Sequence, residues 1–148
     1  MASVEIRPME RGDARAWAQM RLALWPEAGE HAQDMERILT SADEWAFLAE
    51  ADGVPAGFAE ISVRKFANGC ETAPVPFLEG IWVEPELRRR GVGRALVDYV
   101  EAFVRARGFR EIGSDALLGN RASHAAHAAW GFSETERVVY FRKGLDPA

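Results

Sequence analysis

The sequence predicts an α+β fold in which helices cover both faces of a mixed sheet. Segments with strand patterns concentrate in the middle of the chain, whereas patterns of amphipathic helices lie towards both ends. No internal repeat, low-complexity tract or linker interrupts this order, and 148 residues are enough to bury a sizeable core. We therefore expect a single domain over residues 1–148.

The first forty residues predict a strand followed by two helices. Residues 4–8 alternate in polarity, as a strand with one buried face does. Asp13 is a suitable N-cap for a helix whose apolar residues recur at helical spacing until Pro26 ends it. A second helix is expected over residues 30–39.

The centre of the chain predicts a hairpin and a further strand. Residues 45–51 and 54–63 flank Asp52-Gly53, a pair that tolerates the positive φ of tight hairpin turns. An Asn-Gly pair and two prolines mark residues 66–76 as a loop. The apolar residues 77–83 predict the next strand.

The C-terminal part predicts two helices and two strands. From Gly93 the apolar residues follow the i, i+1, i+4, i+7, i+8 stripe of a half-buried helix, which Gly108 is expected to end. A short strand over residues 111–114 and a helix over residues 120–130, capped by its first residue, follow. The last strand, residues 134–142, contains the run Val-Val-Tyr-Phe, so we expect both of its faces to be buried.

Composition narrows the classes of partner. The net charge is −5, from 23 acidic and 18 basic side chains, and a nucleic-acid partner would require a broad basic face. Cys70 is the only cysteine, which excludes an internal disulfide and favours a reducing compartment. No uncharged run approaches the ~20 residues of a membrane span, and the N-terminus carries no targeting pattern. These features predict a cytoplasmic protein without a membrane or nucleic-acid partner.

Residues 88–93, Arg-Arg-Arg-Gly-Val-Gly, lie between a predicted strand and a predicted helix. Backbone N–H groups in the first turn of a helix have no intrahelical partner, and the helix dipole adds positive charge, so such a turn binds anions. Gly91 and Gly93 allow the main chain to approach a ligand closely, and the arginines can hold phosphate oxygens in a bidentate way. The pattern therefore indicates a pyrophosphate site.

Two better-known phosphate loops are excluded by the residues present. A dinucleotide fingerprint would require a third glycine where Leu96 stands, and a P-loop would require a Gly-Lys-Ser/Thr ending. A solvated basic turn that caps a helix is an alternative for the six residues alone. Their position between a strand and a helix favours the anionic ligand.

Arg88-x-x-Gly91-x-Gly93 resembles the acetyl-coenzyme A signature of the GCN5-related N-acetyltransferases. The order of elements is similar to that fold, a mostly antiparallel sheet with helices on both faces, along nearly the whole chain. Short stretches in the right order resemble, more narrowly, the bacterial aminoglycoside 6′-N-acetyltransferases. These stretches are Leu24-Trp25-Pro26, Ala51-Asp52-Gly53-Val54, Asn68-Gly69-Cys70, Phe77-Leu78-Glu79-Gly80-Ile81, Ser114-Asp115, and Gly131-Phe132-Ser133-Glu134-Thr135-Glu136-Arg137-Val138.

The resemblance implies acetyl-coenzyme A as co-substrate, a cationic aminoglycoside as acceptor, and no metal. The backbone at Ile81, Trp82 and Val83 would pair with the pantetheine arm. The pyrophosphate would be held by Arg89, Arg90, Gly91, Val92, Gly93 and Arg94, and Asn120 would contact the cofactor near its thiol.

The resemblance also implies an acceptor pocket lined by Trp25, Phe66, Glu79, Asp115 and Glu136. Phe66 departs from the tyrosine that is usual at its position, so the chain keeps the stacking face and lacks a hydroxyl. Carboxylates in the pocket attract an acceptor that carries several ammonium groups. Glu71 is a further candidate for this acidic lining.

The chemistry requires a base. An attacking amine must lose its proton before it adds to a thioester, and a carboxylate can accept that proton directly or through water. Glu79 is the first candidate, since its strand is expected to present the thioester, and Asp115 is the second. An N–H between Ile81 and Val83 would stabilise the oxyanion. The acid that protonates the thiolate stays open, because His127, where many members of the superfamily have a tyrosine, is equally consistent with an exposed imidazole.

Plainer roles exist for each residue taken singly. Glu79 could be a charge at a strand edge that prevents pairing with another sheet. Asp115 could be an ordinary loop residue, and Glu136 an exposed residue of a strand. Trp25 and Trp82 are residue types that more often belong to a core or an interface. Two other functions stay open. They are acetylation of a polyamine, amino-acid derivative or protein amine, and acetyl-coenzyme A sensing without turnover.

The apolar strand expected over residues 134–142 would be an aggregation hazard at a free sheet edge. The resemblance implies a homodimer in which this strand packs against or into the partner. That arrangement would bring Glu136 to the junction of the two subunits.

Overall fold

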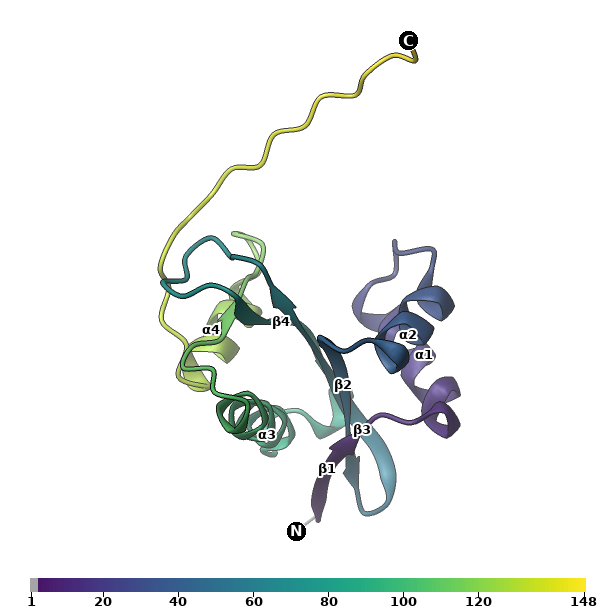
Figure 1. Ribbon diagram of the computed structural model, residues 1–148. Coiled ribbons are helices and arrows are strands. Elements are labelled where there is room, and N and C mark those ends of the chain that lie inside the picture. Colours follow the sequence, from purple (N-terminus) through teal and green to yellow (C-terminus); the bar gives the residue numbers. More distant parts are fainter. Residues whose placement is uncertain (1–2) are drawn as a thin grey trace. The chain divides into compact units, whose positions relative to one another are not determined.

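Five strands form one sheet in the order β1-β2-β3-β4-β5, in a computed structural model that describes residues 3–148 (Figure 1). Four strands pair antiparallel in sequence order: β1 (Val4–Pro8), β2 (Glu44–Ala51), β3 (Val54–Arg64) and β4 (Val75–Val83). The short β5 (Gly113–Ser114) lies parallel to β4. The expected mixed, mostly antiparallel sheet is confirmed.

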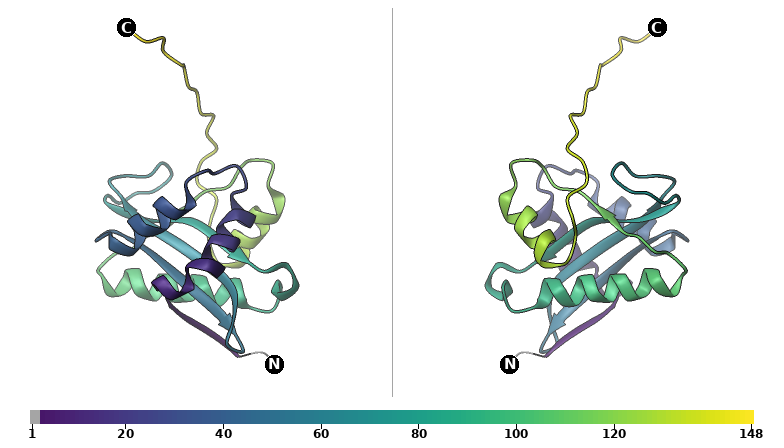
Figure 2. Two further views of the ribbon diagram at one scale, coloured as in Figure 1. Left: turned by 90° about the vertical axis from the view of Figure 1, so that its right-hand side faces the viewer. Right: turned by 90° about the vertical axis from the view of Figure 1, so that its left-hand side faces the viewer.

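Helices cover both faces of this sheet. α1 (Ala14–Leu24) and α2 (His31–Thr40) lie against one face, and α3 (Val92–Ala106) lies against the other, as the two views of Figure 2 show. Among residues 3–148, no helix has both the length and the apolar character needed to cross a membrane.

The alternation of side chains along β2 divides the core between the two faces. Ala46 and Leu48 are buried with residues of α1 and α2. Phe47 points the other way and packs on Tyr99 and Phe103 of α3, with ring centroids 5.2 Å and 4.9 Å apart. The side of α3 that faces the sheet carries the predicted apolar stripe, in which Val92, Leu96, Val97, Val100 and Val104 are buried.

The start of α1 differs from the prediction. A single 3-10 turn, η1 (Arg11–Asp13), precedes the helix, and the Asp13 side chain makes no capping hydrogen bond to α1. Its carboxylate accepts two hydrogen bonds of 2.8 Å from Arg7 and one of 2.9 Å from the Glu10 N–H. Because bonds to a guanidinium are stronger than those to a neutral donor, Asp13 joins β1 to the entry of α1 and does not cap the helix.

The chain divides into two compact units, Met1–Asp115 and Ala116–Ala148, which are described separately. The second unit contains α4 (Arg121–Ala129), and the cap predicted for it is confirmed, since the Asn120 side chain accepts a 3.1 Å hydrogen bond from the Ser123 N–H.

Residues 134–142 are not a strand, so that prediction is wrong. Val138, Val139, Tyr140 and Phe141 are 52%, 74%, 77% and 92% exposed, so the expected burial is wrong as well. An extended segment becomes a strand only when its N–H and C=O groups pair with a neighbouring strand. Among residues 3–148, no strand pairs with this segment.

Candidate active site

The pairing of β3 with β4 is irregular at Glu79. Glu60 pairs with Gly80 and Ile61 pairs with Leu78, so Glu79 is an extra residue on β4. A bulge of this kind bends the strand and changes the direction of the bulged side chain.

The carboxylate of Glu79 is paired with Arg64 and Ser62. Its Oε2 accepts hydrogen bonds from Ser62 Oγ at 2.6 Å and from Arg64 Nε at 2.9 Å, and its Oε1 accepts one from Arg64 Nη2 at 2.6 Å. The Arg64 guanidinium also stacks over the ring of Phe77, 3.6 Å from its centroid. A carboxylate has about four lone-pair directions, so Oε1 retains room for one more donor.

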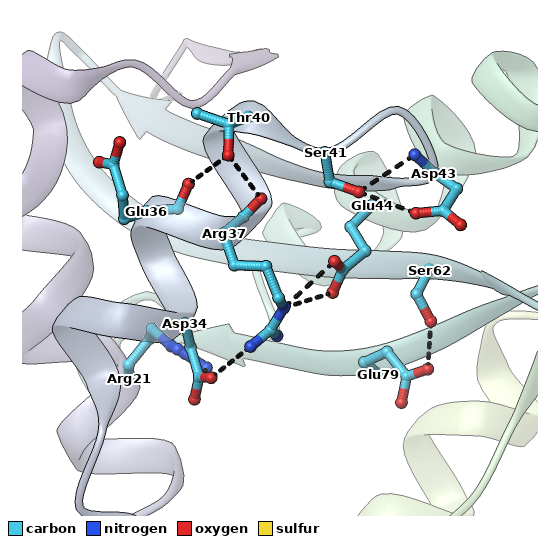
Figure 3. Close-up of polar contacts among 10 residues, drawn as sticks. All are labelled: Arg21, Asp34, Glu36, Arg37, Thr40, Ser41, Asp43, Glu44, Ser62 and Glu79. Carbon is cyan, nitrogen blue, oxygen red and sulfur yellow. Dashed lines mark hydrogen bonds and ion pairs between the residues drawn. The ribbon is translucent and has the colours of Figure 1, made fainter.

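Glu79 faces a cavity of ≈ 690 Å³ formed by the end of α1, by α2 and by the middle strands. Figure 3 shows several of its charged side chains, which come from different elements and converge on one region. The cavity is lined by Arg21, Leu24, Trp25, Pro26, Glu27, Ala28, Asp34, Arg37, Ile38, Glu44, Glu60, Ile61, Ser62 and Glu79.

Carboxylates outnumber cations in this lining. Five acidic residues (Glu27, Asp34, Glu44, Glu60 and Glu79) accompany two basic ones (Arg21 and Arg37). Arg37 donates to Asp34 at 2.6 Å and to both oxygens of Glu44 at 3.2 Å (Figure 3). A cavity with an excess of negative charge favours a cationic ligand.

Glu60 is the most deeply buried of these carboxylates, with 4% of its surface exposed. Burial raises its pKa to about 7, although the nearby Arg21 cation and the hydrogen bond from Trp17 act in the opposite direction. Trp17 Nε1 donates to its Oε2 at 2.8 Å, and Arg21 Nε lies 3.3 Å from the same oxygen.

The sequence reasoning missed Arg21 and Glu60, although a signal was present. Arg21 lies four residues after Trp17 on the buried side of α1, and Glu60 interrupts the apolar run of β3. A single charge inside an apolar pattern indicates a buried partner of opposite charge.

Trp25 and Glu79, both predicted to line an acceptor pocket, do line the same cavity. The Trp25 ring lies against Gly80, where a Cβ atom would be 2.3 Å from Trp25 Cζ2. The ring also meets Phe58 edge to face, at a centroid distance of 6.1 Å.

The other predicted acceptor residues are not brought to this cavity. Phe66 is 70% exposed and Asp115 is also exposed, and neither is among the lining residues. Glu136 belongs to the second unit and is exposed. Glu71 and the neighbouring Thr72 are held by Glu111, whose carboxylate accepts from both of their backbone N–H groups.

β4 leaves one edge open beyond Leu78, because β5 pairs only with Phe77 and Leu78. The Glu84 N–H donates to the Ala56 carbonyl on β3 at 2.8 Å. Hydrogen-bonded pairs alternate along an antiparallel ladder, so the N–H and C=O groups of Ile81 and Val83 point away from β3, whereas those of Trp82 point towards it.

Beyond β4, the short η2 (Pro85–Leu87) leads into the N-terminus of α3. Gly91 is the N-cap residue with a φ of +87°, and Arg89 also has a positive φ of 65°. The first intrahelical bond joins the Ala95 N–H to the Gly91 carbonyl at 2.9 Å, so the N–H groups of the three residues between them have no intrahelical acceptor.

The side chains around this turn suit a phosphate group. Arg89, Arg90 and Arg94 are exposed, and a Cβ atom at Gly91 would meet no protein atom within 4 Å. Val92 is buried, so only its backbone could contact a ligand. Arg88 has another role, because its Nε donates to the Val83 carbonyl at 2.8 Å and its guanidinium lies 4.6 Å from the Trp82 ring centroid.

In the second unit, side chains in and next to α4 contact residues that are close to them in the sequence. The Asn120 oxygen is used in the helix cap, which leaves its amide N–H groups for other contacts. His127 Nδ1 lies 2.7 Å from the Ser123 carbonyl, and its ring packs against Trp130 and Phe132.

Known proteins share this architecture and much of this sequence. The chain is 48% identical, over 97% of its length and 95% of the other protein, to the "Aminoglycoside N(6')-acetyltransferase type 1" of Stenotrophomonas maltophilia. The solved structure of AAC(6')-Iy in complex with the bisubstrate analogue CoA-S-monomethyl-acetylneamine has a TM-score of 0.91 and 41% identity, covering 97% of this chain and 99% of that one.

A second solved structure is similar to the same degree. AAC(6')-Ih from Acinetobacter baumannii, an aminoglycoside 6'-N-acetyltransferase, has a TM-score of 0.91 and 41% identity, with coverage of 97% and 100%. The model of the "Acetyltransferase (GNAT) family" matches residues 13–132, which include the bulged β4 and the turn before α3. The chain therefore belongs to the acetyltransferase (GNAT) family.

Proposed function

We propose that this protein transfers the acetyl group of acetyl-coenzyme A to the 6′-amino group of aminoglycosides. The cavity beside the bulge of β4 carries the proposal, since five carboxylates line it and the same strand presents outward-pointing backbone groups. Relatives that are 42% to 48% identical over nearly the whole chain carry the name of this activity, which supports the same conclusion.

The chain supplies binding and proton transfer for this reaction. Acetyl-coenzyme A is the co-substrate; the turn from Arg89 to Arg94 would hold its pyrophosphate, the outward-pointing backbone of Ile81 and Val83 its pantetheine arm, and Asn120 would lie near its thiol. Trp82, expected to pair as well, directs its backbone groups to β3. The Glu79 carboxylate accepts the proton of the attacking amine through the free direction on Oε1, and Asp115 is a second candidate base. An outward-pointing N–H at Ile81 or Val83 stabilises the oxyanion.

The acceptor is held by charge and by aromatic surface. Trp25 and Phe66 provide faces for the sugar rings, while Glu79, Asp115 and Glu136 attract the ammonium groups. With Cys70 as the only cysteine, a reducing cytoplasmic location suits the protein.

We further propose that the protein acts as a homodimer. The exposed apolar run from Val138 to Phe141 supports this, because contiguous apolar surface of this kind marks an association site. Glu136 would then stand close to the subunit junction.

A steady-state assay with a thiol reagent tests the activity. Aminoglycosides that carry a 6′-amino group should release coenzyme A, whereas matched aminoglycosides with a 6′-hydroxyl and simple polyamines should not. Faster turnover of a polyamine, or equal turnover of the 6′-hydroxyl compounds, would contradict the proposed acceptor.

A further inference from the structure

Arg21 is a cation buried in the wall of the cavity, with 5% of its surface exposed. Two carboxylates hold it: its Nε lies 3.3 Å from Glu60 Oε2, and its Nη2 lies 3.5 Å from Asp34 Oδ2. Burying a guanidinium is costly unless it is paired, and these two carboxylates supply the pairing.

The guanidinium of Arg21 contacts Trp25. Its Cζ lies 4.9 Å from the centre of the indole ring. The backbone N–H of Trp25 donates to the Arg21 carbonyl at 2.7 Å. Trp25 follows the last residue of α1 and has a non-helical backbone, so the helix does not set the direction of its side chain. The indole instead contacts three groups: the guanidinium, the ring of Phe58, and Gly80 on β4, where a Cβ atom would collide with it.

The contacts of Arg21 and those of Trp25 both lead to the bulge of β4. Glu60, which holds Arg21, is the strand partner of Gly80, and Gly80 follows the bulged Glu79 directly. The buried pair of Glu60 and Arg21 is thus next to the bulge on one side and in contact with the Trp25 indole on the other.

We propose that Arg21, held by Glu60, is a positioning residue that fixes the Trp25 indole against Gly80 and so sets the acceptor end of the cavity. This inference rests on the proposed function, because it assigns Trp25 to the wall that receives the aminoglycoside. Arg21 touches neither the turn before α3 nor the outward-pointing backbone of β4, so acetyl-coenzyme A binding does not depend on it.

A double-mutant cycle tests the proposal. Arg21→Met removes the charge and keeps the length of the side chain, and it should raise the aminoglycoside KM ~10-fold while the acetyl-coenzyme A KM stays unchanged. In the Trp25→Ala background the same change should have almost no further effect, because Arg21 acts through Trp25. Arg21→Lys retains a cation near the indole and should restore part of the loss.

A matched control is Arg7→Met. Arg7 is also paired with two carboxylates, Asp13 and Glu50, but it does not line the cavity. This variant should leave both KM values unchanged. If Arg21→Met raises both KM values equally, or raises the aminoglycoside KM as much without Trp25 as with it, the positioning role is overturned.

Arg21→Met leaves Glu60 buried without its cation, so the paired variant Arg21→Met, Glu60→Gln provides a second route if the single variant does not fold.

A substrate-free readout is the fluorescence of Trp25, taken as the difference between proteins with tryptophan and phenylalanine at position 25. Its emission should change on loss of Arg21 and stay unchanged in Arg7→Met. This result is independent of which acceptor is acetylated, so failure of the proposed function and failure of the positioning role give different outcomes.

Discussion

Four of the acidic residues that line the cavity, Asp34, Glu44, Glu60 and Glu79, already have partners. Glu79 is bound by Arg64 and Ser62, Glu44 by Arg37, and Glu60 by Trp17 with Arg21 close by. A cationic acceptor therefore competes with internal cations for these carboxylates. Each carboxylate is also held in a fixed direction before the acceptor arrives, which lowers the reorganisation needed for the reaction.

Glu79→Gln should lower kcat about 100-fold or more, because the amide cannot take the proton of the attacking amine. Glu44→Gln removes the same charge from the same cavity without being next to the bulge, so it should raise the aminoglycoside KM and leave kcat close to its normal value. Steady-state kinetics of the two variants separate base catalysis from electrostatic attraction. Equal losses of kcat would mean that Glu79 acts only through its charge.

Glu60 should make stability depend on pH. Burial raises its pKa from 4.5 to about 7, so between these values the folded chain holds a proton that the unfolded chain has released. The contribution to stability is therefore full below pH 4.5 and is lost as the pH rises through about 7, a change of about 3 kcal/mol.

Glu60→Gln cannot titrate and should lack this slope. The free energy of unfolding of the variant, relative to the unmodified protein, should rise by about 3 kcal/mol between about pH 4 and about pH 8. Urea denaturation at a series of pH values measures this difference. A constant difference across the range would show that Glu60 ionises with an ordinary pKa.

At the scale of elements, the middle of β4 and its C-terminal end have different proposed roles in the site. The bulge at Glu79 turns a side chain towards the proposed acceptor cavity, and the outward-pointing backbone at Ile81 and Val83 leads to the turn before α3. A single strand thus connects the proposed acceptor end with the proposed cofactor end, and the two ends can be tested separately.

Gly91 and Gly108, just outside the two ends of α3, offer a matched pair for the cofactor end. Their φ values are +87° and +89°, and a Cβ atom at either would meet no protein atom within 4 Å. Valine at either position should therefore cost a similar amount of backbone strain, about 1–3 kcal/mol. Only Gly91→Val should raise the acetyl-coenzyme A KM strongly, since only that side chain would obstruct the pyrophosphate. Equal effects of the two variants on that KM would remove the turn from the proposed cofactor site.

At the scale of the whole molecule, residues 138–141 expose a run of apolar side chains that is unusual for a monomeric protein. Val139, Tyr140 and Phe141 are each more than 70% exposed, and they follow one another directly. A second copy of the chain could supply the strand partner that the described residues do not provide.

Ending the chain after Glu134 should abolish both association and activity if the homodimer is correct. Sedimentation at micromolar concentration and the coenzyme A release assay measure the two properties. Leu145→Ser is the control, because Leu145 is an exposed apolar residue outside the run and its loss should change neither property. An unmodified chain that sediments at the 16.4 kDa monomer mass and is fully active would exclude the dimer.

The sequence by itself determined the helices, the hairpin and the turn before α3. These features depend on local rules: apolar spacing along α3, the Asp52-Gly53 turn, and a glycine where the backbone requires positive φ at residue 91. The candidate roles of Trp25 and Glu79 came from a family resemblance and not from these local rules, and the fold brings both residues to one cavity.

Only the tertiary structure decided which groups pair. Glu60 meets Trp17 across 43 positions of sequence, Arg64 meets Glu79 across 15, and Asp13 binds Arg7 of β1 where local rules predict a helix cap. Residues 134–142 show the same limit, because an apolar, β-branched run supplies strand propensity but not a partner strand. Local patterns fix local conformation, whereas ion pairs, bulges and strand pairing depend on distant residues that only the folded chain brings together.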